Sequence, residues 1–260
     1  MGDEIEILRW LARLQLARNR LQEARALYQR ILSHFPDDLD AQFQIVRLDR
    51  WLGNLPDAIA SLRELCSQHP ERPEYRRELA SALYAHRQYK ETAGLWKEVE
   101  QAFPSDDNAQ IRSAVAQVRA SDDPRAIEQT RGYLERTPMG GVTRIMGLET
   151  LTMVARRAGR FEEAARYVRQ RMGCETDPER QRRWLFRTVE LLQRTKSAGS
   201  GPLEEAVRLV AESLKEHPWD VDQRLVRAEI LLELKRYDEV LAEFLEVLQR
   251  WSPANPFGPP

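Results

Sequence analysis

The chain has 260 residues, of which 42% are hydrophobic and 31% are charged. This composition can build a hydrophobic core beneath a strongly polar surface. The 40 basic and 41 acidic residues leave a net charge of -1, which argues against a nucleic-acid partner, because general nucleic-acid binders need a basic field to displace the counterions of the phosphates.

Two classes of feature are missing from the sequence. Cys66 and Cys174 lie far apart and outside any metal-ligand spacing, so they predict neither a disulfide framework nor a zinc site. No stretch approaches the ~18 apolar residues that a membrane span requires. The Met-Gly-Asp-Glu start and the SPANPFGPP end are typical of a fragment cut from a larger protein, and the preference for Arg over Lys favours a bacterial source. The compartment, bacterial cytoplasm or periplasm, depends on the flanking sequence.

Internal periodicity is the strongest signal. Prolines occur at 36, 70, 104 and 138, each 34 residues after the last, and they close the phrases YQRILSHFP, LRELCSQHP, WKEVEQAFP and RGYLERTP. Two apolar helical patterns with a polar break between them precede each proline. Because proline lacks an N–H and restricts the residue before it, it ends the second helix. The sequence therefore predicts repeated helix pairs.

The same side-chain types recur at fixed offsets within each period. A small residue stands twelve positions before each proline, and in three of the four copies a bulky residue stands eight before. A small residue lets paired helices approach closely, and a bulky one fills the space beside it. The small set is Ala24, Ala58, Thr92 and Ala126, and the second set is Tyr28, Leu62, Trp96 and, as the exception, Thr130.

This pattern resembles the tetratricopeptide repeat. The segments Ala158–Ala164 (AGRFEEA) and Lys235–Val240 (KRYDEV) are similar to the turn and second-helix start of that family, and Trp184 matches its first-helix Trp position. The resemblance implies an all-α, right-handed α-solenoid (superhelix) of antiparallel helix pairs over residues 1–254. The predicted copies are 5–38, 39–72, 73–106, 107–140, 145–178, 181–220 and 221–254, with 255–260 as a linker or tail.

The repeat has irregular places. Its register slips near 139–144 and 195–202, and the fourth copy is the weakest. The last predicted helix, VLAEFLEVLQRW, carries apolar residues on more than one side, whereas a terminal repeat needs a polar outer face. We expect a following segment to cover it; self-association is the alternative.

No constellation for catalysis, metal or cofactor binding appears. His34, His69 and His217 stand just before repeat-closing prolines, where a helix C-terminus favours positive charge. Neither GSGP nor MGG is followed by the Lys-Ser/Thr of a phosphate-binding loop. We therefore expect a non-enzyme without metal or cofactor.

In the resembled family the first helix of each pair lines a concave groove that holds a peptide. The positions implied here are Arg-rich with aromatic interruptions: Arg9, Arg13, Phe43, Gln44, Arg47, Arg77, Ser81, Tyr84, Arg112 and Arg119. Such a surface suits a partner protein or peptide with acidic and apolar side chains. The alternative is that these residues are solvated and paired with Glu6, Asp40, Glu74 and Glu78.

One known variant of such a groove clamps the C-terminal carboxylate of chaperones with cations and amides. The clamp positions correspond to Arg9, Arg13, Gln44, Glu74 and Glu78. Two carboxylates where the clamp requires cations would repel this ligand, so a chaperone-tail adaptor is not expected.

Two further functions stay open. Similar arrays occur in periplasmic exopolysaccharide export assemblies, so the alternative partner is an anionic or partly deacetylated polysaccharide, or the enzyme that modifies it, with Trp10, Trp51 or Tyr84 as stacking surfaces. The third possibility is that a flanking domain, outside this sequence, carries an enzyme.

Overall fold

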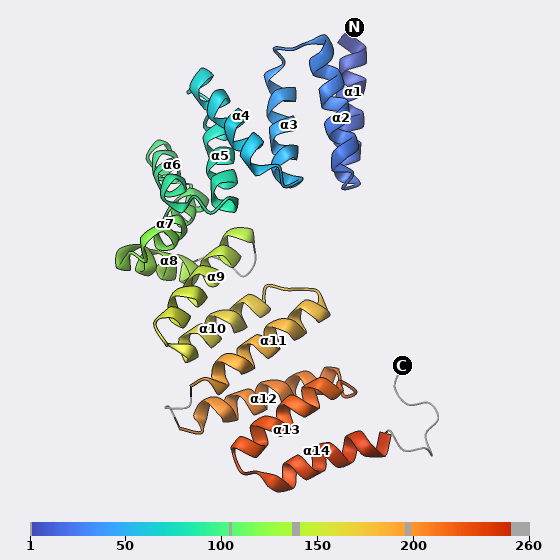
Figure 1. Cartoon of the computed structure of the whole chain (residues 1–260), viewed down its shortest axis with the longest axis vertical. Coiled ribbons are helices and arrows are strands. Elements are labelled where there is room, and N and C mark those ends of the chain that lie inside the picture. Colours follow the sequence, from blue (N-terminus) through green and yellow to red (C-terminus); the bar gives the residue numbers. More distant parts are fainter. Residues whose placement is uncertain (1, 104–105, 137–140, 196–198, 251–260) are drawn as a thin grey trace. The chain divides into compact units, whose positions relative to one another are not determined.

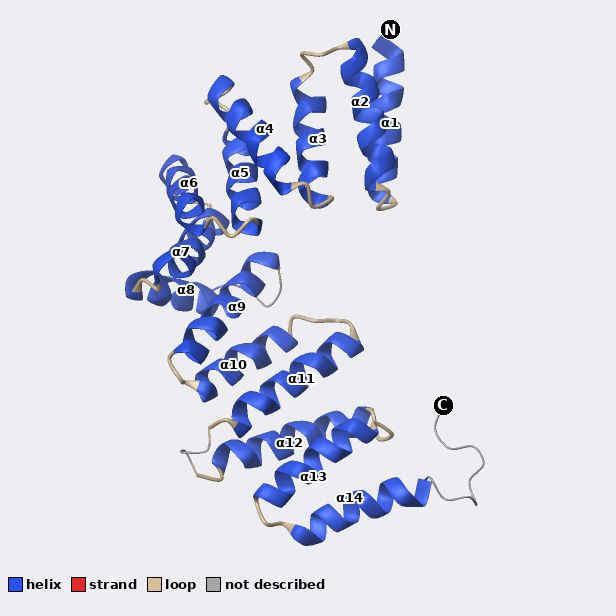
Figure 2. Ribbon diagram, in the orientation of Figure 1, coloured by secondary structure: helices blue, strands red, loops and turns tan. Residues whose placement is uncertain are grey.

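In the computed structural model, residues 2–103, 106–136, 141–195 and 199–250 are described. They form fourteen α-helices and no strand. Figure 1 labels these helices, and Figure 2 colours them by secondary structure. The first helices of the seven pairs are α1 (Gly2–Ala17), α3 (Leu39–Trp51), α5 (Pro73–Ala85), α7 (Asp107–Ser121), α9 (Val142–Arg157), α11 (Pro178–Gln193) and α13 (Val221–Glu233). The second helices are α2 (Leu21–His34), α4 (Leu55–Gln68), α6 (Tyr89–Ala102), α8 (Pro124–Arg136), α10 (Phe161–Met172), α12 (Gly201–Glu216) and α14 (Tyr237–Arg250). The all-α fold class is confirmed.

The chain divides into two compact units, Met1–Thr130 and Arg131–Pro260, with the boundary inside α8. We call them unit 1 and unit 2 and describe each by itself. Pro104 and Pro138, parts of both irregular joints and the 255–260 tail lie outside the described residues. The residue bounds of the individual copies remain predictions. No described helix is long and apolar enough to cross a bilayer.

In unit 1 each helix packs on the next along the chain from α1 to α7. Its core is a series of clusters, each of which joins one helix pair to the first helix of the following pair. The first cluster contains Tyr28 and Ile31 of α2 with Ala41 and Leu48 of α3. The second joins α4 to α5 in the same way, and the third joins α6 to α7. Each pair thus buries its apolar face against its neighbour, as expected for a solenoid.

The small residues predicted at the pair interface are fully buried. Ala24, Thr92 and Ala126 have no exposed surface, and Ala58 has 1%. The neighbouring bulky residues are also buried, including Trp96 at 4%. Thr92 satisfies its hydroxyl by donating to the carbonyl of Gln88 at 2.8 Å, so a polar residue can occupy this position without an unmet hydrogen bond.

The turns inside the first three pairs share one backbone feature. Asn19, Gly53 and Arg87, which are one period apart, all have positive φ, at 56°, 92° and 63°. Glycine adopts this left-handed region without steric cost and asparagine adopts it readily, whereas an arginine there is strained.

In unit 2 consecutive helices from α9 to α14 also pack pairwise. Its buried side chains include Leu148, Leu151, Leu191, Ile230 and Leu231. Asp177 and Asp220 begin α11 and α13 by accepting hydrogen bonds from backbone N–H groups of the first turn. His217 is the C-cap residue of α12, and His69 is that of α4 in unit 1, which are the helix ends at which the sequence places them.

Candidate functional site

All ten predicted site residues lie on first helices of unit 1. Two are on α1, three each on α3 and α5, and two on α7. Their contacts divide them into separate groups, so they do not form one uniform surface.

Arg9 and Arg77 are held by the protein itself. Arg9 donates to the carboxylate of Asp38 at 2.6 Å, and Arg77 lies 2.8 Å from the carboxylate of Asp106. Each aspartate is the N-cap residue of the next first helix, α3 or α7, and also accepts from that helix's backbone N–H groups. These arginines therefore tie one helix pair to the next.

The pKa shifts of the Arg9–Asp38 pair support this role. Partial burial would raise the pKa of Asp38, but hydrogen bonds from the Ala41 N–H and from Arg9 outweigh it and hold that pKa below its ordinary value. The same hydrogen bond raises the pKa of Arg9. Arg182 repeats the contact in unit 2, where it lies 2.6 Å from Asp220.

Phe43 stands one period from both Arg9 and Arg77 but makes an aromatic contact instead. Its ring centroid lies 4.8 Å from that of Tyr75, at the start of α5. The N-cap residue of α5 is Arg72 rather than an aspartate, so the ionic tie has no partner here and an apolar contact replaces it.

Arg47 lies against aromatic rings on its own helix. Its guanidinium carbon is 5.0 Å from the Trp51 ring centroid and 5.9 Å from that of Phe43. Its hydrogen-bond partner is neutral, the Gln44 amide oxygen at 3.3 Å. Arg13, one period earlier on α1, lies in the same way over Trp10 at 5.6 Å. Such cation–π contacts orient a guanidinium without neutralising it.

Arg112 supplies a third guanidinium by reaching back from α7 to α5. It donates to the Ser81 hydroxyl at 3.2 Å and lies 5.1 Å from the buried Trp96 ring. Burial lowers the pKa of Arg112, and the nearby positive charge of Arg50 adds to this. Ser81 is one period from Arg47, so Arg112 brings a positive charge to a position where α5 itself has only a hydroxyl.

We call Arg13, Arg47 and Arg112 the arginine row. Within the described residues, none of the three forms an ion pair with a carboxylate. Arg50, which lies close by, differs in this respect because it is bound to Glu78 at 2.6 Å. The row therefore consists of oriented cations without an ion-paired carboxylate on the first, second and fourth helix pairs, and the last of them reaches back to the third pair.

Tyr84 and Arg119 belong to a different place. The Tyr84 and Tyr89 rings meet edge to face at 5.3 Å, and Arg119 lies over the Tyr89 ring at 5.8 Å. Tyr89 and Arg119 line an open cleft with Arg87 and Lys90. Of these two predicted site residues, only Arg119 lines the cleft.

Comparison with known proteins agrees with this geometry. Residues 15–82 match the sequence model described as the tetratricopeptide repeat. This segment belongs to the tetratricopeptide-repeat family. No curated protein sequence matches it significantly.

Solved structures share the tetratricopeptide-repeat fold at low identity. PilW, a type IV pilus biogenesis factor, is 14% identical, with 85% of this chain and 97% of PilW covered and a TM-score of 0.59. A tetratricopeptide repeat protein from Parabacteroides merdae is also 14% identical, covers 95% of this chain and 93% of its own, and has a TM-score of 0.57. Pseudomonas aeruginosa pilF is 13% identical, with 88% and 98% covered and the same TM-score. These likenesses concern the fold alone.

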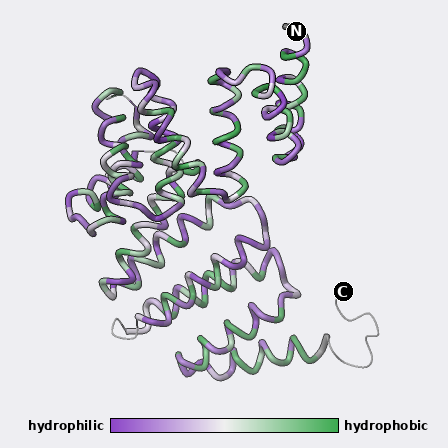
Figure 3. The backbone as a smooth tube through the Cα atoms, turned by 45° about the horizontal axis from the view of Figure 1, so that its top comes forward, coloured by the Kyte–Doolittle hydropathy of each residue, from purple (hydrophilic) through white to green (hydrophobic). Residues whose placement is uncertain are grey.

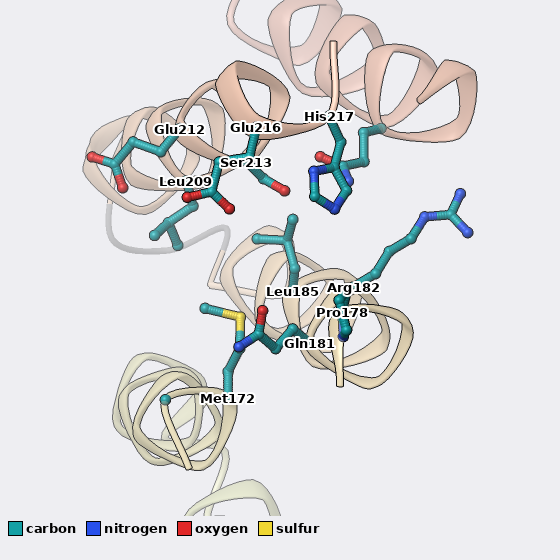
Figure 4. A pocket seen from close by; sticks show the side chains of 12 residues that line it. Met172, Pro178, Gln181, Arg182, Leu185, Leu209, Glu212, Ser213, Glu216 and His217 are labelled. Atoms are coloured by element: carbon teal, nitrogen blue, oxygen red, sulfur yellow. The ribbon is translucent and has the colours of Figure 1, made fainter. Parts of the chain in front are cut away.

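Unit 2 contains a cavity that the sequence did not predict. It has a volume of about 260 Å³ and is bounded by the end of α10, by α11, by α12 and by the start of α13. Figure 4 shows the His217 ring directed towards Leu185, whereas the Arg182 guanidinium points away from the cavity. Met172 and Leu209 complete an apolar wall. Within the described residues, no cluster of acidic, His and Cys side chains could hold a metal ion.

The sequence also did not predict a second group of arginines around an aromatic ring. Arg171 of α10 lies 4.9 Å from the ring centroid of Trp184 on α11, and Trp184 lines an open cleft with Arg180, Arg183 and Arg187. The run RQRRWLFR at 180–187 is the signal that could have indicated it. Arg180 and Arg187 pair with carboxylates on neighbouring turns. The positive charge of this cleft is therefore neutralised to a greater extent than that of the arginine row.

Proposed function

We propose that the chain is a non-catalytic scaffold that holds an extended segment of a partner protein, rich in acidic and apolar side chains, along the arginine row. Tetratricopeptide-repeat proteins are in general protein-interaction scaffolds, and this chain has their fold. The observation that carries the finer proposal is that three guanidiniums, from the first, second and fourth helix pairs, are fixed by rings or a hydroxyl and form no ion pair with a described carboxylate.

Acidic side chains fit this arrangement on physical grounds. A planar guanidinium binds a carboxylate through two parallel, charge-assisted hydrogen bonds. A charge that is partly withdrawn from water gains more from an opposite charge than a solvated one does. Arg112 is in that situation, since its burial lowers its pKa.

Apolar side chains fit the rings that accompany the row. Trp10 is 66% exposed and Trp51 is 42% exposed, and each has an arginine against its ring. A partner side chain packed on the free part of either ring would be desolvated together with the ion pair that the adjacent arginine forms with the partner. Such burial is typical of interface residues that dominate binding.

The test uses fluorescein-labelled peptides of equal length in which Asp or Glu alternates with Leu or Phe, with Lys replacing the acids in the reference peptide. Fluorescence anisotropy should show binding of the acidic series that weakens as salt increases. The Arg13→Gln/Arg47→Gln variant should bind the acidic peptides at least tenfold more weakly.

The matched control is Arg20→Gln/Arg208→Gln, which changes the net charge equally at exposed residues that lie on none of the helices α1, α3 and α7. Its affinity should equal that of the wild type. Equal loss in both variants would show a general charge effect, and no loss in either would refute the row as a binding site. Arg9 and Arg77 are unsuitable for this test because they tie helix pairs together.

A carbohydrate ligand is the second candidate. The specific observation is that two exposed indoles, Trp10 and Trp51, lie on successive first helices of unit 1. Titration with anionic and partly deacetylated oligosaccharides should then change tryptophan fluorescence, and Trp51→Ala should reduce that change. A flat titration would eliminate a carbohydrate ligand.

A further inference from the structure

The large apolar side chains that remain exposed are concentrated on the terminal helix pairs. Of the sixteen found within the described residues, four lie on α1, two on α13 and five on α14. Figure 3 shows hydrophobic residues along much of the last helix before the C-terminus. The eleven residues are Ile7, Trp10, Leu11, Leu14, Leu225, Leu232, Tyr237, Leu241, Phe244, Leu245 and Leu248.

The exposed face of α1 corresponds to a packing face in the following first helix. Ile7 and Leu14 stand one period before Ala41 and Leu48 of α3. Ala41 and Leu48 are each only 1% exposed, because they pack on Tyr28 and Ile31 of the preceding α2. In α1 the same positions are 59% and 47% exposed. α1 therefore presents a surface made to receive a preceding second helix.

The exposed face of α14 is the opposite half of that interface. Counted from the start of each helix, Leu241 and Phe244 of α14 correspond to Ile59 and Leu62 of α4. Ile59 and Leu62 are 4% and 0% exposed, because they belong to the core that joins α4 to α5. Leu241 and Phe244 are 60% and 39% exposed. α14 therefore presents a surface made to receive a following first helix.

The two terminal faces are both apolar at a position where the contact between two internal helix pairs is an ion pair. Arg50 of α3 binds Glu78 of α5 at 2.6 Å. The equivalent positions at the two ends of the chain are Leu232 of α13 and Trp10 of α1, which are 46% and 66% exposed. An ion pair inside the array is thus replaced by two apolar side chains, one on each terminal face, so that joining the faces would strand no charge.

We propose that α1 of one copy docks on α13 and α14 of a second copy and continues the stack head to tail. A following segment of chain would cover α14 alone and a preceding segment would cover α1 alone, whereas a second copy covers both faces through one kind of contact. The contact is heterologous, because each copy uses a different surface at each end. It therefore leaves a free face at both ends of every dimer and allows further copies to add.

Sedimentation velocity on the intact chain at increasing concentration tests the proposal. The wild type should grow beyond a dimer as its concentration rises. Ile7→Glu/Leu14→Glu and Leu241→Lys/Leu248→Lys should each be monomeric alone, since each has lost one of the two faces. An equimolar mixture of them should form a one-to-one dimer and nothing larger, because one intact α14 face then meets one intact α1 face.

The control is Val142→Glu, which charges an equally exposed apolar residue (67%) on α9 and should associate like the wild type. Far-ultraviolet circular dichroism checks that each variant stays helical, and Trp10→Gln with Leu248→Gln provides a milder pair of changes. A wild type that is monomeric at every concentration would overturn the proposal. So would an α1 variant that still dimerises alone, because this would show α14 pairing with itself.

Discussion

The guanidinium of Arg9 donates a 2.6 Å hydrogen bond to the carboxylate of Asp38, which caps the next first helix. One carboxylate thereby serves two purposes: it satisfies a backbone N–H at the start of α3 and anchors α1 to it. Arg77 and Asp106 repeat this pairing, so the contact recurs between helix pairs of the array. Arginines that look equivalent in sequence consequently have different roles, since some hold the stack together and others remain able to meet a partner.

Replacing Asp38 with alanine should destabilise unit 1. The change removes the hydrogen bond from the Ala41 N–H, for which the usual cost is about 1 kcal/mol, and it leaves Arg9 without its anion. We expect the free energy of unfolding measured in urea to fall by about 1 to 2 kcal/mol. Asp37→Ala changes the exposed neighbour and should have almost no effect. Equal losses of unfolding free energy in the two variants would contradict a role for Asp38 in joining α1 to α3.

The stabilisation from Asp38 should depend on pH. Its pKa is lower in the folded chain than in the unfolded chain, so the folded state binds fewer protons at this group and the contribution is fully present above about pH 4. It is lost as the pH falls through the folded pKa. The difference in unfolding free energy between wild type and Asp38→Asn should therefore shrink between pH 5 and pH 2. A difference independent of pH would show that Asp38 is not the titrating group.

The sequence predicted the fold well because one physical requirement is repeated. Each pair must bury a small residue and a bulky residue at fixed offsets, and this requirement is visible in the order of the residues as a 34-residue period. The arginine–aspartate contacts between helix pairs also follow the period, since Arg9 and Arg77 are each followed 29 residues later by an aspartate. The second copy has Phe43 and Arg72 at these positions and lacks the tie.

The candidate site was less predictable because it depends on side-chain reach between helices. The spacing of Phe43, Arg47 and Trp51, four residues apart on one helix, does place Arg47 beside both rings. Nothing in the sequence indicates that Arg112 extends back to Ser81. The cavity beside His217 likewise arises from the ends of four helices meeting in space. Offsets along the chain indicate which helix face a residue occupies, but they do not give the direction of a long side chain.

Arg87 should be a site where glycine stabilises the chain. Its φ of 63° lies in the left-handed region, which costs about 1 to 2 kcal/mol for a residue with a Cβ. Glycine removes this cost but gains entropy in the unfolded chain. We expect Arg87→Gly to raise the unfolding free energy by about 0.5 to 1 kcal/mol, as measured by urea denaturation.

The reverse change supplies the control. Gly53 occupies the same turn one period earlier with a φ of 92°, and a Cβ added there would meet no atom within 4 Å. Gly53→Arg should therefore lose stability through the backbone alone, by about 1 kcal/mol. Asn19→Gly should change little, because asparagine tolerates this conformation. Stabilisation by Gly53→Arg would show that the turn is not strained.

The last helix pair depends on a buried ion pair. Arg224 of α13 donates to Glu243 of α14 at 2.8 Å and to the Pro218 carbonyl at 3.1 Å and 3.0 Å. Both charged side chains are at most 10% exposed, and Arg227 also contacts Glu243. Breaking such a pair leaves one charge buried without its partner, which typically costs about 3 to 5 kcal/mol.

Arg224→Met should therefore lower the unfolding free energy by about 3 kcal/mol. This is the lower end of the usual range, because Arg227 still contacts Glu243. The double change Arg224→Met/Glu243→Leu should be less damaging than the sum of its single changes, since no buried carboxylate then remains to be desolvated. A double-mutant cycle in urea measures this coupling, with the exposed Arg208→Met as the control. Additive single effects would mean that the two side chains act independently.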